Sequence, residues 1–415
     1  MSCTNPKREF FGNVINQYGG YCVDCFTKGW TSYVCKDCLE KCHVNHKIID
    51  LGKHKFCCKC FCTHLCKFSP DDPKKSELVK YDSVISITNK LGFECLDKII
   101  SPCSLMMVLS LLKVGSSEIT LDEFNKVIPF SDIQEIFKAL DKSNECQIYN
   151  YIFTKIPLAD PFKKSCIAQI SDGINLKELN EIVTKKTNGL ITNPFKPELI
   201  SDTSVTILNI IYFKAKWVNI FNESETKESK FYFGDKTRMI PFMNNDYVYC
   251  YYFCDCDYKI MEMCYGTGNE SESVFSFGII LPNDSYELPK ITDSQLQYYI
   301  SKLEKQKMDK ITVPKFNVKE EMALNDTLIK IGLKSTFSES SNFHNMTEVP
   351  VFVSLIKQMV CLDVNEKGTE AGAITYGIIG QCGCNVKTEF IANHPFIYYL
   401  RYKPLNVILF LGKFE

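Results

Sequence analysis

The stretch that decides the fold reads Val364-Asn365-Glu366-Lys367-Gly368-Thr369-Glu370-Ala371-Gly372-Ala373-Ile374-Thr375-Tyr376. After Gly368, every second residue is small: Thr369, Ala371, Ala373 and Thr375. Successive side chains of an extended segment point to opposite faces, so these residues share one face. A face of this kind can slide between two strands of a sheet, and Gly368 offers a hinge because glycine adopts φ values closed to other residues. The alternative interpretation is a flexible linker of small residues.

Two apolar segments close the chain. They read Asn393-His394-Pro395-Phe396-Ile397-Tyr398-Tyr399-Leu400-Arg401 and Val407-Ile408-Leu409-Phe410-Leu411-Gly412-Lys413-Phe414. A short turn separates them, and such continuous apolar runs are typical of strands that are buried on both faces. The sequence therefore predicts two buried strands after the hinge segment.

With the hinge run and this tail, the chain resembles the serpin family, and further landmarks of that family follow in order. They are Ile99-Ile100-Ser101-Pro102-Cys103-Ser104, Leu179-Asn180-Glu181-Ile182-Val183, Thr187-Asn188-Gly189-Leu190-Ile191, Leu208-Asn209-Ile210-Ile211-Tyr212-Phe213-Lys214-Ala215-Lys216-Trp217 and Val313-Pro314-Lys315-Phe316. The resemblance covers about residues 77–415. It implies an α+β fold with three β-sheets, surrounding helices and an exposed reactive loop at about residues 368–390.

The resemblance also implies an activity, namely suicide-substrate inhibition of a protease, so that the chain is not itself an enzyme. The protease would attack the loop, and the cleaved loop would insert into the main sheet. The hinge set is Gly368, Thr369, Glu370, Ala371, Gly372, Ala373 and Thr375, and the reactive-site window is Gln381, Cys382, Gly383, Cys384 and Asn385. Small uncharged residues in that window favour an elastase-like serine protease or a papain-like cysteine protease as the partner. A trypsin-like cut at Lys387 is the alternative.

Two features depart from the family pattern. The strand before the hinge usually carries a histidine that bonds to the asparagine matching Asn209, and Lys357 takes that position by our alignment. The region between Phe124 and Leu176 is also short for its usual helices, although Tyr149 to Ile156 alternates like a strand. These departures sustain a second hypothesis, a non-inhibitory binding protein or ubiquitin-pathway adaptor that uses the serpin fold as a scaffold.

The first 68 residues have a composition of their own. They hold ten Lys/Arg against five Asp/Glu, about +5, whereas the rest holds 38 against 44, about −6. Eleven of the 22 cysteines and four of the six histidines lie before residue 67. Pairs spaced by two residues can close on one tetrahedral ion, so the sequence predicts a zinc-binding module with about two or three Zn²⁺ ions. Metal ligation would supply most of its folding free energy. The alternative is a disulfide-linked module.

The order of these residues is similar to that of a UBR-box zinc finger over residues 21–68, with a cross-braced ZZ or B-box finger as the alternative. The ligands implied by the resemblance are Cys22, Cys25, Cys35, Cys38, His43, His46, Cys58, Cys60 and Cys66. UBR boxes bind basic N-termini through acidic side chains, but Lys59 stands where the acid is expected. A positive site repels a positive ligand, so we carry over the zinc scaffold and not the ligand. We expect the basic surface to be solvated rather than bound to nucleic acid.

The segment between the two regions is Lys67-Phe68-Ser69-Pro70-Asp71-Asp72-Pro73-Lys74-Lys75-Ser76. Its prolines and polar residues predict a semi-rigid linker at 69–76. Met1 to Arg8 contain no apolar run of a secretory signal, which predicts an intracellular protein, cytoplasmic or nucleocytoplasmic. No run of about eighteen apolar residues occurs, so no membrane span is expected.

Overall fold

The computed structural model describes the backbone of residues 15–22, 34–35, 48–56, 73–129, 140, 145–166, 168–173, 175–187, 189, 192, 195, 197, 205–266, 270, 272–354, 356–368 and 388–415. Side chains are described from Val84 onward, apart from those of residues 147, 208 and 357. Backbone contacts divide the chain into two units, Met1–Tyr81 and Asp82–Glu415. In the described part of the chain, no helix has both the length and the apolar content to cross a membrane.

The first unit contains a small antiparallel sheet. Its strands are β1 (Ile15–Cys22), β2 (Val34–Cys35) and β3 (Ile48–Phe56), with β1 in the middle. Cys22 is paired with Ile48, and Phe56 with Ile15. The ends of β1 and β3 therefore coincide.

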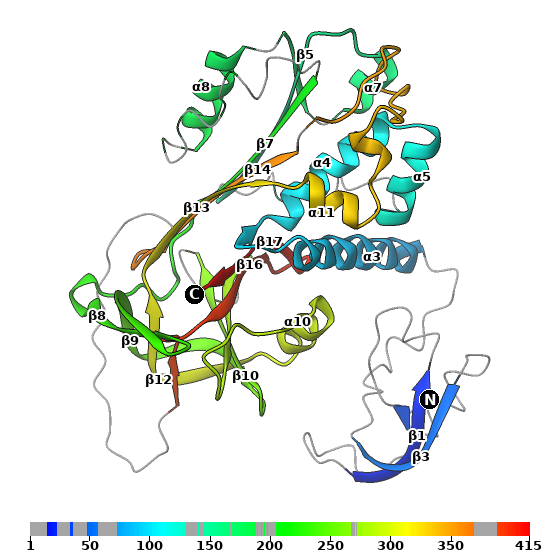
Figure 1. Ribbon diagram of the computed structural model, residues 1–415. Helices are drawn as coiled ribbons and strands as arrows, with labels where there is room; N and C mark the ends of the chain where they lie inside the picture. The colour runs from blue at the N-terminus through cyan, green and yellow to red at the C-terminus, as the bar shows by residue number, and fades with distance from the viewer. Residues whose placement is uncertain are drawn as a thin grey trace. The chain divides into compact units, whose positions relative to one another are not determined.

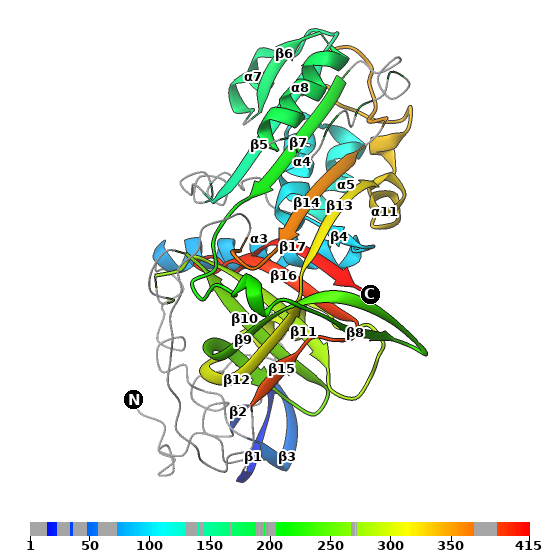
Figure 2. The ribbon, with the colours of Figure 1, turned by 90° about the vertical axis from the view of Figure 1, so that its left-hand side faces the viewer.

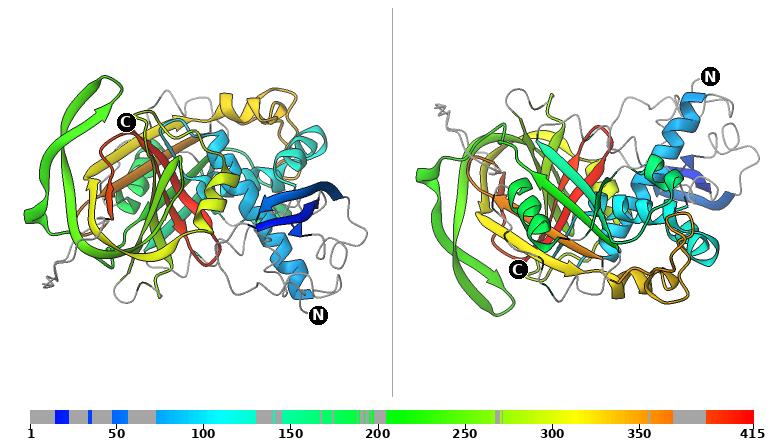
Figure 3. Two further views of the ribbon diagram at one scale, coloured as in Figure 1. Left: turned by 90° about the horizontal axis from the view of Figure 1, so that it is seen from below. Right: turned by 90° about the horizontal axis from the view of Figure 1, so that it is seen from above.

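The larger sheet of the second unit has nine strands. The order is β15-β12-β9-β10-β11-β16-β17-β4, and β8 pairs with β9. The bounds are β4 Ile99–Ile100, β8 Lys227–Phe233, β9 Lys236–Cys254, β10 Tyr258–Tyr265, β11 Phe275–Pro282, β12 Glu304–Pro314, β15 Glu389–Ile391, β16 Phe396–Tyr402 and β17 Val407–Phe414. The two predicted closing strands are confirmed as β16 and β17, which are almost wholly buried. The hairpin of β8 and the start of β9 extends from this sheet (Figure 3).

The other sheet of this unit has five strands in the order β13-β14-β7-β5-β6. The bounds are β5 Cys146–Thr154, β6 Gln169–Asp172, β7 Val205–Phe213, β13 Phe316–Ala323 and β14 Lys357–Val364. The strand predicted at Tyr149 to Ile156 is thus β5. The prediction of three sheets differs from the structure, because the nineteen-residue β9 pairs with both β12 and β10 and joins two of the expected sheets into one.

Helices cover both faces of the five-stranded sheet (Figure 1). Leu179 and Val183 of α8 (Leu176–Lys186) pack against Tyr151, Ile210 and Met359 on one face. The buried helix α4 (Pro102–Gly115) lies on the other face, where its Ser104 side chain forms a hydrogen bond with Asn209 of β7. The remaining helices are α3 Pro73–Glu94, α5 Glu118–Val127, α7 Asp160–Ser165, α10 Asp293–Ile300 and α11 Asn325–Lys330, with short 3-10 turns at Glu223–Glu225 and Ser335–Phe337.

The helices bear on two predictions, the end of the linker and the short region between Phe124 and Leu176. Helix α3 begins at Pro73, so the last four residues of the predicted linker are helical, because proline fits the first turn of a helix. Residues 69–72 lie outside the described residues. In the described part of the short region, α5 ends at Val127, Leu140 is helical and α7 has six residues.

Candidate functional site

The site begins at a discontinuity in the five-stranded sheet. Strands β7 and β14 are neighbours in the sheet (Figure 2). They are parallel, and Met359 and Ile210 form their one register pair. By contrast, β13 and β14 pair along their whole length, as do β5 and β7. The sheet is therefore two well-bonded halves that meet along a weak seam.

A tight turn follows the C-terminal end of β14. Asn365 and Gly368 exchange backbone hydrogen bonds of 3.2 Å each. Gly368 has φ of 117°, and a Cβ there would lie 2.3 Å from the carbonyl oxygen of Ala215. Only glycine tolerates both the positive φ and this close approach. Gly368, which the sequence predicts as the hinge glycine, thus lies in a tight turn at the C-terminal end of the seam.

Buried charge holds this turn in place. The Glu366 carboxylate lies 2.8 Å from Lys315 Nζ and accepts a 2.7 Å hydrogen bond from Thr226 Oγ1. Burial acts to raise the pKa of Glu366, but the hydrogen bonds from Lys315 and Thr226 outweigh it, and the net pKa lies below its usual value of 4.5. Lys367, on the other arm of the turn, pairs with Glu223 at 2.8 Å.

An aromatic stack contacts the same turn. Trp217 is buried, and its ring stacks on Tyr265 with centroids 4.2 Å apart. Trp217 Nε1 donates to the Asn365 carbonyl at 2.8 Å, and its backbone N–H donates to the Lys367 carbonyl at 3.1 Å. The turn is thereby fixed to the end of β7, so any strand that follows Gly368 starts at the seam.

A buried polar cluster spans the seam near the start of β14. Gln358 of β14 makes two hydrogen bonds with the backbone of Ser101, one from the Ser101 N–H at 2.7 Å and one to its carbonyl at 3.0 Å. On the other half of the sheet, Asn209 of β7 accepts from Ser104 Oγ and donates to Asn150 Oδ1 at 2.7 Å. The N-terminal turn of α4 therefore ties the two halves together.

This cluster bears on one prediction. The β14 residue that the structure places in the cluster is Gln358, one position after the Lys357 of our alignment. The side chain of Lys357 lies outside the described residues. Asn209 is buried as expected, but its amide partners are Ser104 and Asn150.

The far end of the loop is anchored on the nine-stranded sheet. Thr388 N–H donates to Asp309 Oδ2 at 2.7 Å, and Asp309 N–H donates to the Thr388 carbonyl at 2.9 Å. Strand β15 then runs parallel to β12. The segment between Gly368 and Thr388 thus joins the two sheets. The other hinge residues, Thr369 to Thr375, and the window Gln381 to Asn385 lie outside the described residues.

The predicted metal ligands fall mostly outside the described residues as well. Cys22 ends β1 and Cys35 ends β2, whereas Cys25, Cys38, His43, His46, Cys58, Cys60 and Cys66 lie outside. The one group of three donor side chains in the described part of the chain is Asp255, Cys256 and Asp257, in the turn between β9 and β10. The Asp255 carboxylate there accepts two backbone N–H groups, so it serves the turn.

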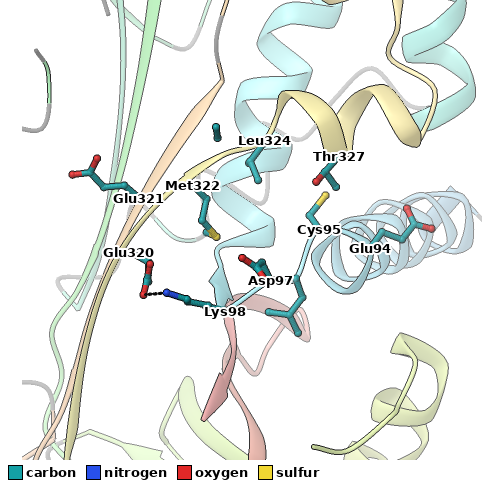
Figure 4. Close-up of a pocket in the computed structure, with 11 residues that line it drawn as sticks. Glu94, Cys95, Asp97, Lys98, Glu320, Glu321, Met322, Leu324 and Thr327 are labelled. Atoms are coloured by element: carbon teal, nitrogen blue, oxygen red, sulfur yellow. Dashed lines mark hydrogen bonds and ion pairs between the residues drawn. The ribbon is translucent and has the colours of Figure 1, made fainter. Parts of the chain in front are cut away.

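A pocket of about 560 Å³ lies between the end of α3, β13 and α11 (Figure 4). Its lining residues are Glu94, Cys95, Leu96, Asp97, Lys98, Glu320, Glu321, Met322, Ala323, Leu324 and Thr327. Lys98 forms a 3.1 Å ion pair with Glu320. Burial, with a smaller effect of Glu94, raises the pKa of the Cys95 thiol to about 12, so it remains protonated and is a poor nucleophile at neutral pH.

Sequence reasoning did not single out three residues of the seam, namely Lys315, Thr226 and Gln358. Lys315 was visible within the Val313-Pro314-Lys315-Phe316 landmark. Its ion pair with Glu366 was not visible there. Thr226 and Gln358 carried no local signal, because their roles arise from contacts between segments that are 140 and 257 residues apart in sequence.

Comparison with known proteins shows which family this chain is similar to. The family model described as "Serpin (serine protease inhibitor)" matches residues 96–415. Serine proteinase inhibitor 2 of variola virus is 28% identical over 333 residues, which cover 76% of this chain and 93% of that protein. Leukocyte elastase inhibitor A of Rattus norvegicus is 32% identical over 256 residues, 57% of this chain and 65% of its own.

Solved structures are similar to this chain in fold. A crystal structure of maspin has a TM-score of 0.71 at 22% identity and covers 80% of this chain and 98% of maspin. The expected serpin fold is therefore confirmed for the larger unit. The UBR-box resemblance of the N-terminal region is not supported by the matched residues of the family model, which begin at 96.

Proposed function

The chain belongs to the serpin family, and on this premise we propose that it inhibits an endopeptidase as a suicide substrate. The observation that carries the proposal is the seam, where the parallel strands β7 and β14 share one register pair and the Gly368 turn follows the end of β14. A strand that leaves β14 through a tight turn runs antiparallel to β14. Because β7 is parallel to β14, the same strand is antiparallel to both neighbours and can bond to each.

Each step of inhibition has a candidate residue in this arrangement. The protease nucleophile attacks the loop and forms an acyl-enzyme, while the segment after the cut stays bound through Thr388 and β15. The part of the loop before the cut, which begins at Gly368, enters the seam and carries the attached protease with it. The small face of Thr369, Ala371 and Ala373 favours entry. Each new backbone hydrogen bond stabilises the inserted state by about 1 kcal/mol net.

The polar cluster opposes this insertion. Gln358 holds β14 to Ser101, and Asn209 holds β7 to Ser104, three residues further along the chain. Separation of the strands strains or breaks at least one of these ties. Together with the Glu366 anchor, they keep the seam closed until cleavage frees the loop.

We propose an elastase-like serine protease or a papain-like cysteine protease as the target, cut within Gln381 to Asn385. The small uncharged residues of that window support this choice. Similarity to the rat protein named leukocyte elastase inhibitor A gives it further support. The nine cysteines whose side chains the structure describes, from Cys95 to Cys361, are all free thiols, which suits a reducing, intracellular location.

We also propose that residues 1–68 bind Zn²⁺ and act as a recognition element for a protein partner. The cysteine and histidine spacings support it. If the chain did not inhibit any protease, this module would instead make it an adaptor on a serpin-fold scaffold, which is the second candidate function. The short α7 in the region of shortened helices is the observation that favours it.

The test is to incubate the full chain with elastase-like, chymotrypsin-like, trypsin-like and papain-like proteases. An adduct that survives denaturing electrophoresis, with a new N-terminus between Gln381 and Asn385, is the expected result. A cut after Lys387 would reassign the target to a trypsin-like protease. Cleavage without an adduct, with the protease still active, would overturn the inhibitor proposal and favour the adaptor.

A further inference from the structure

Tyrosine and lysine side chains gather on one face of β9 and β12, and β12 is the neighbour of β15 (Figure 2). Directly opposite residues of an antiparallel pair share a face, and Tyr249 lies opposite Lys307. Tyr251 likewise lies opposite Lys305. Lys307 Nζ is 5.7 Å from the centre of the Tyr247 ring, and Lys305 Nζ is 5.2 Å from that of Tyr249. We call these five residues the tyrosine–lysine face.

The tyrosine–lysine face is open to solvent and carries more lysine than acid. Lys403 Nζ lies 5.1 Å from the centre of the Tyr251 ring and adds a third lysine. The Glu270 carboxylate lies 2.8 Å from Lys305 Nζ and so offsets one of the three. Lys307 makes no ion pair with any residue that the structure describes. Its ammonium group is therefore available to an acidic group of a partner.

The backbone of Tyr247 is strained. Its φ of 56° lies in the left-handed region, which a bulky residue rarely adopts. Packing of the ring offsets little of this strain, because 49% of Tyr247 remains exposed. Strained residues of this kind gather at binding and catalytic sites, where they fix a side chain in one position. The strain therefore indicates that the exposed ring has a function outside the core.

The tyrosine–lysine face adjoins the point where the reactive loop rejoins the sheet. Asp309 follows Lys307 by two residues, about 7 Å along β12, and its carboxylate accepts the Thr388 N–H at 2.7 Å. Asn385, the last residue of the proposed cleavage window, precedes Thr388 by three residues, so the chain keeps it within about 11 Å of Thr388. A globular domain of about 200 residues has a radius of gyration of roughly 16 Å. An endopeptidase bound at the window is thus large enough to reach this face.

We propose that the tyrosine–lysine face is a second contact surface for the target endopeptidase, and that it fits an acidic patch beside the active-site cleft of that enzyme. The proposal rests on the proposed inhibition and adds a determinant of specificity that lies outside the loop. Lysines at an interface mainly raise the association rate, whereas exposed tyrosines contribute contact area at a low cost in side-chain entropy. Two proteases that cleave the same loop sequence are then inhibited at different rates, according to the charge around their active sites.

The test measures the second-order rate constant of adduct formation, at low and at high salt, with the protease that the panel identifies. Lys307→Glu should lower this rate constant about fivefold at low salt, and the difference should shrink at high salt because salt screens the attraction. The matched control is Lys330→Glu on α11, which changes the net charge equally at an exposed position and should keep the wild-type rate constant. Both variants should consume the same number of inhibitor molecules per protease as the wild type, since the face takes no part in loop insertion.

A second measurement tests the tyrosines separately from the charge. A protease whose nucleophile has been replaced binds the loop without cleaving it, and Tyr249→Ser should weaken this binding about tenfold at an unchanged melting temperature. Equal rate constants for Lys307→Glu and Lys330→Glu at both salt concentrations, or wild-type binding by Tyr249→Ser, would overturn the second contact surface while inhibition itself stands.

Two further outcomes would also overturn the proposal. If Lys307→Glu loses binding to a fluorescent single-stranded oligonucleotide while its rate constants stay unchanged, the face serves a nucleic acid instead. If the wild type forms no adduct with any protease, the proposed inhibition fails, and the second contact surface fails with it.

Discussion

The hydrogen bonds of Gln358 give the sharpest quantitative prediction. In Gln358→Leu the side chain keeps nearly the same volume but loses both its donor and its acceptor. The Ser101 carbonyl still accepts from Leu105 N–H at 3.0 Å, so the group left without its partner is the fully buried Ser101 N–H. An unsatisfied buried donor costs about 1–3 kcal/mol, and we take about 2 kcal/mol.

The expected shift in melting temperature follows from the size of the unit. Residues Asp82–Glu415 have an unfolding entropy of roughly 0.7 kcal/mol per kelvin at about 2.1 cal/mol/K per residue. A loss of about 2 kcal/mol then lowers the first thermal transition by about 3 °C. Differential scanning calorimetry measures it. Loop insertion on heating should also start earlier, which native electrophoresis detects as polymers.

A matched variant separates this effect from general damage. Gln306 on β12 is exposed, so Gln306→Leu should change stability by no more than about 0.5 kcal/mol. If Gln358→Leu melts at the wild-type temperature, or if both variants shift equally, the tie between β14 and α4 does not hold the seam closed.

Three further predictions concern the hinge, and one concerns the metal. Gly368→Ala combines a positive φ with a Cβ that meets backbone atoms, so it should cost at least about 1–3 kcal/mol and reduce adduct yield; unchanged melting would refute the strain. Ala371→Arg places a charge on the inserting face and should turn the inhibitor into a substrate, which is measured as cleavage of the loop without an adduct. The control Glu370→Arg, on the opposite face, should still form the adduct. The pKa of Glu366 is lowered on folding, so its ionisation contributes stability that is fully present above its unfolded pKa of 4.5 and is lost as pH falls through the lower folded pKa. Glu366→Gln should therefore remove this acid-dependent part from the curve of unfolding free energy against pH, and parallel curves for the variant and the wild type would contradict the argument. Chelation of zinc should unfold residues 1–68 by circular dichroism and leave adduct formation intact, and loss of adduct would show that the two units are coupled.

Local sequence patterns predicted what depended on neighbours along the chain. The apolar runs at Phe396 and Val407 became β16 and β17, and the glycine of the hinge run took a φ that few other residues adopt. The boundary at Pro73 was missed because a polar proline-containing segment is typical of both a linker and the first turn of a helix.

Non-local contacts were harder to foresee. The polar cluster joins residues from β14, β7, β5 and the start of α4, and no local pattern marks Gln358 as its member. Our alignment places Lys357 at this position, one residue before Gln358, and in a strand a shift of one residue exchanges one face for the other. Likewise, the continuity of β9 between two expected sheets depends on its pairing with β12, which the strand's own sequence does not reveal.

The pairing of β17 has a consequence for synthesis. β17 lies between β16 and β4, and Leu411 pairs with Ile100, more than three hundred residues earlier. A growing polypeptide therefore cannot complete the nine-stranded sheet until residues 407–414 have left the ribosome. A chain that stops before Val407 exposes the edges of both β16 and β4, which favours aggregation.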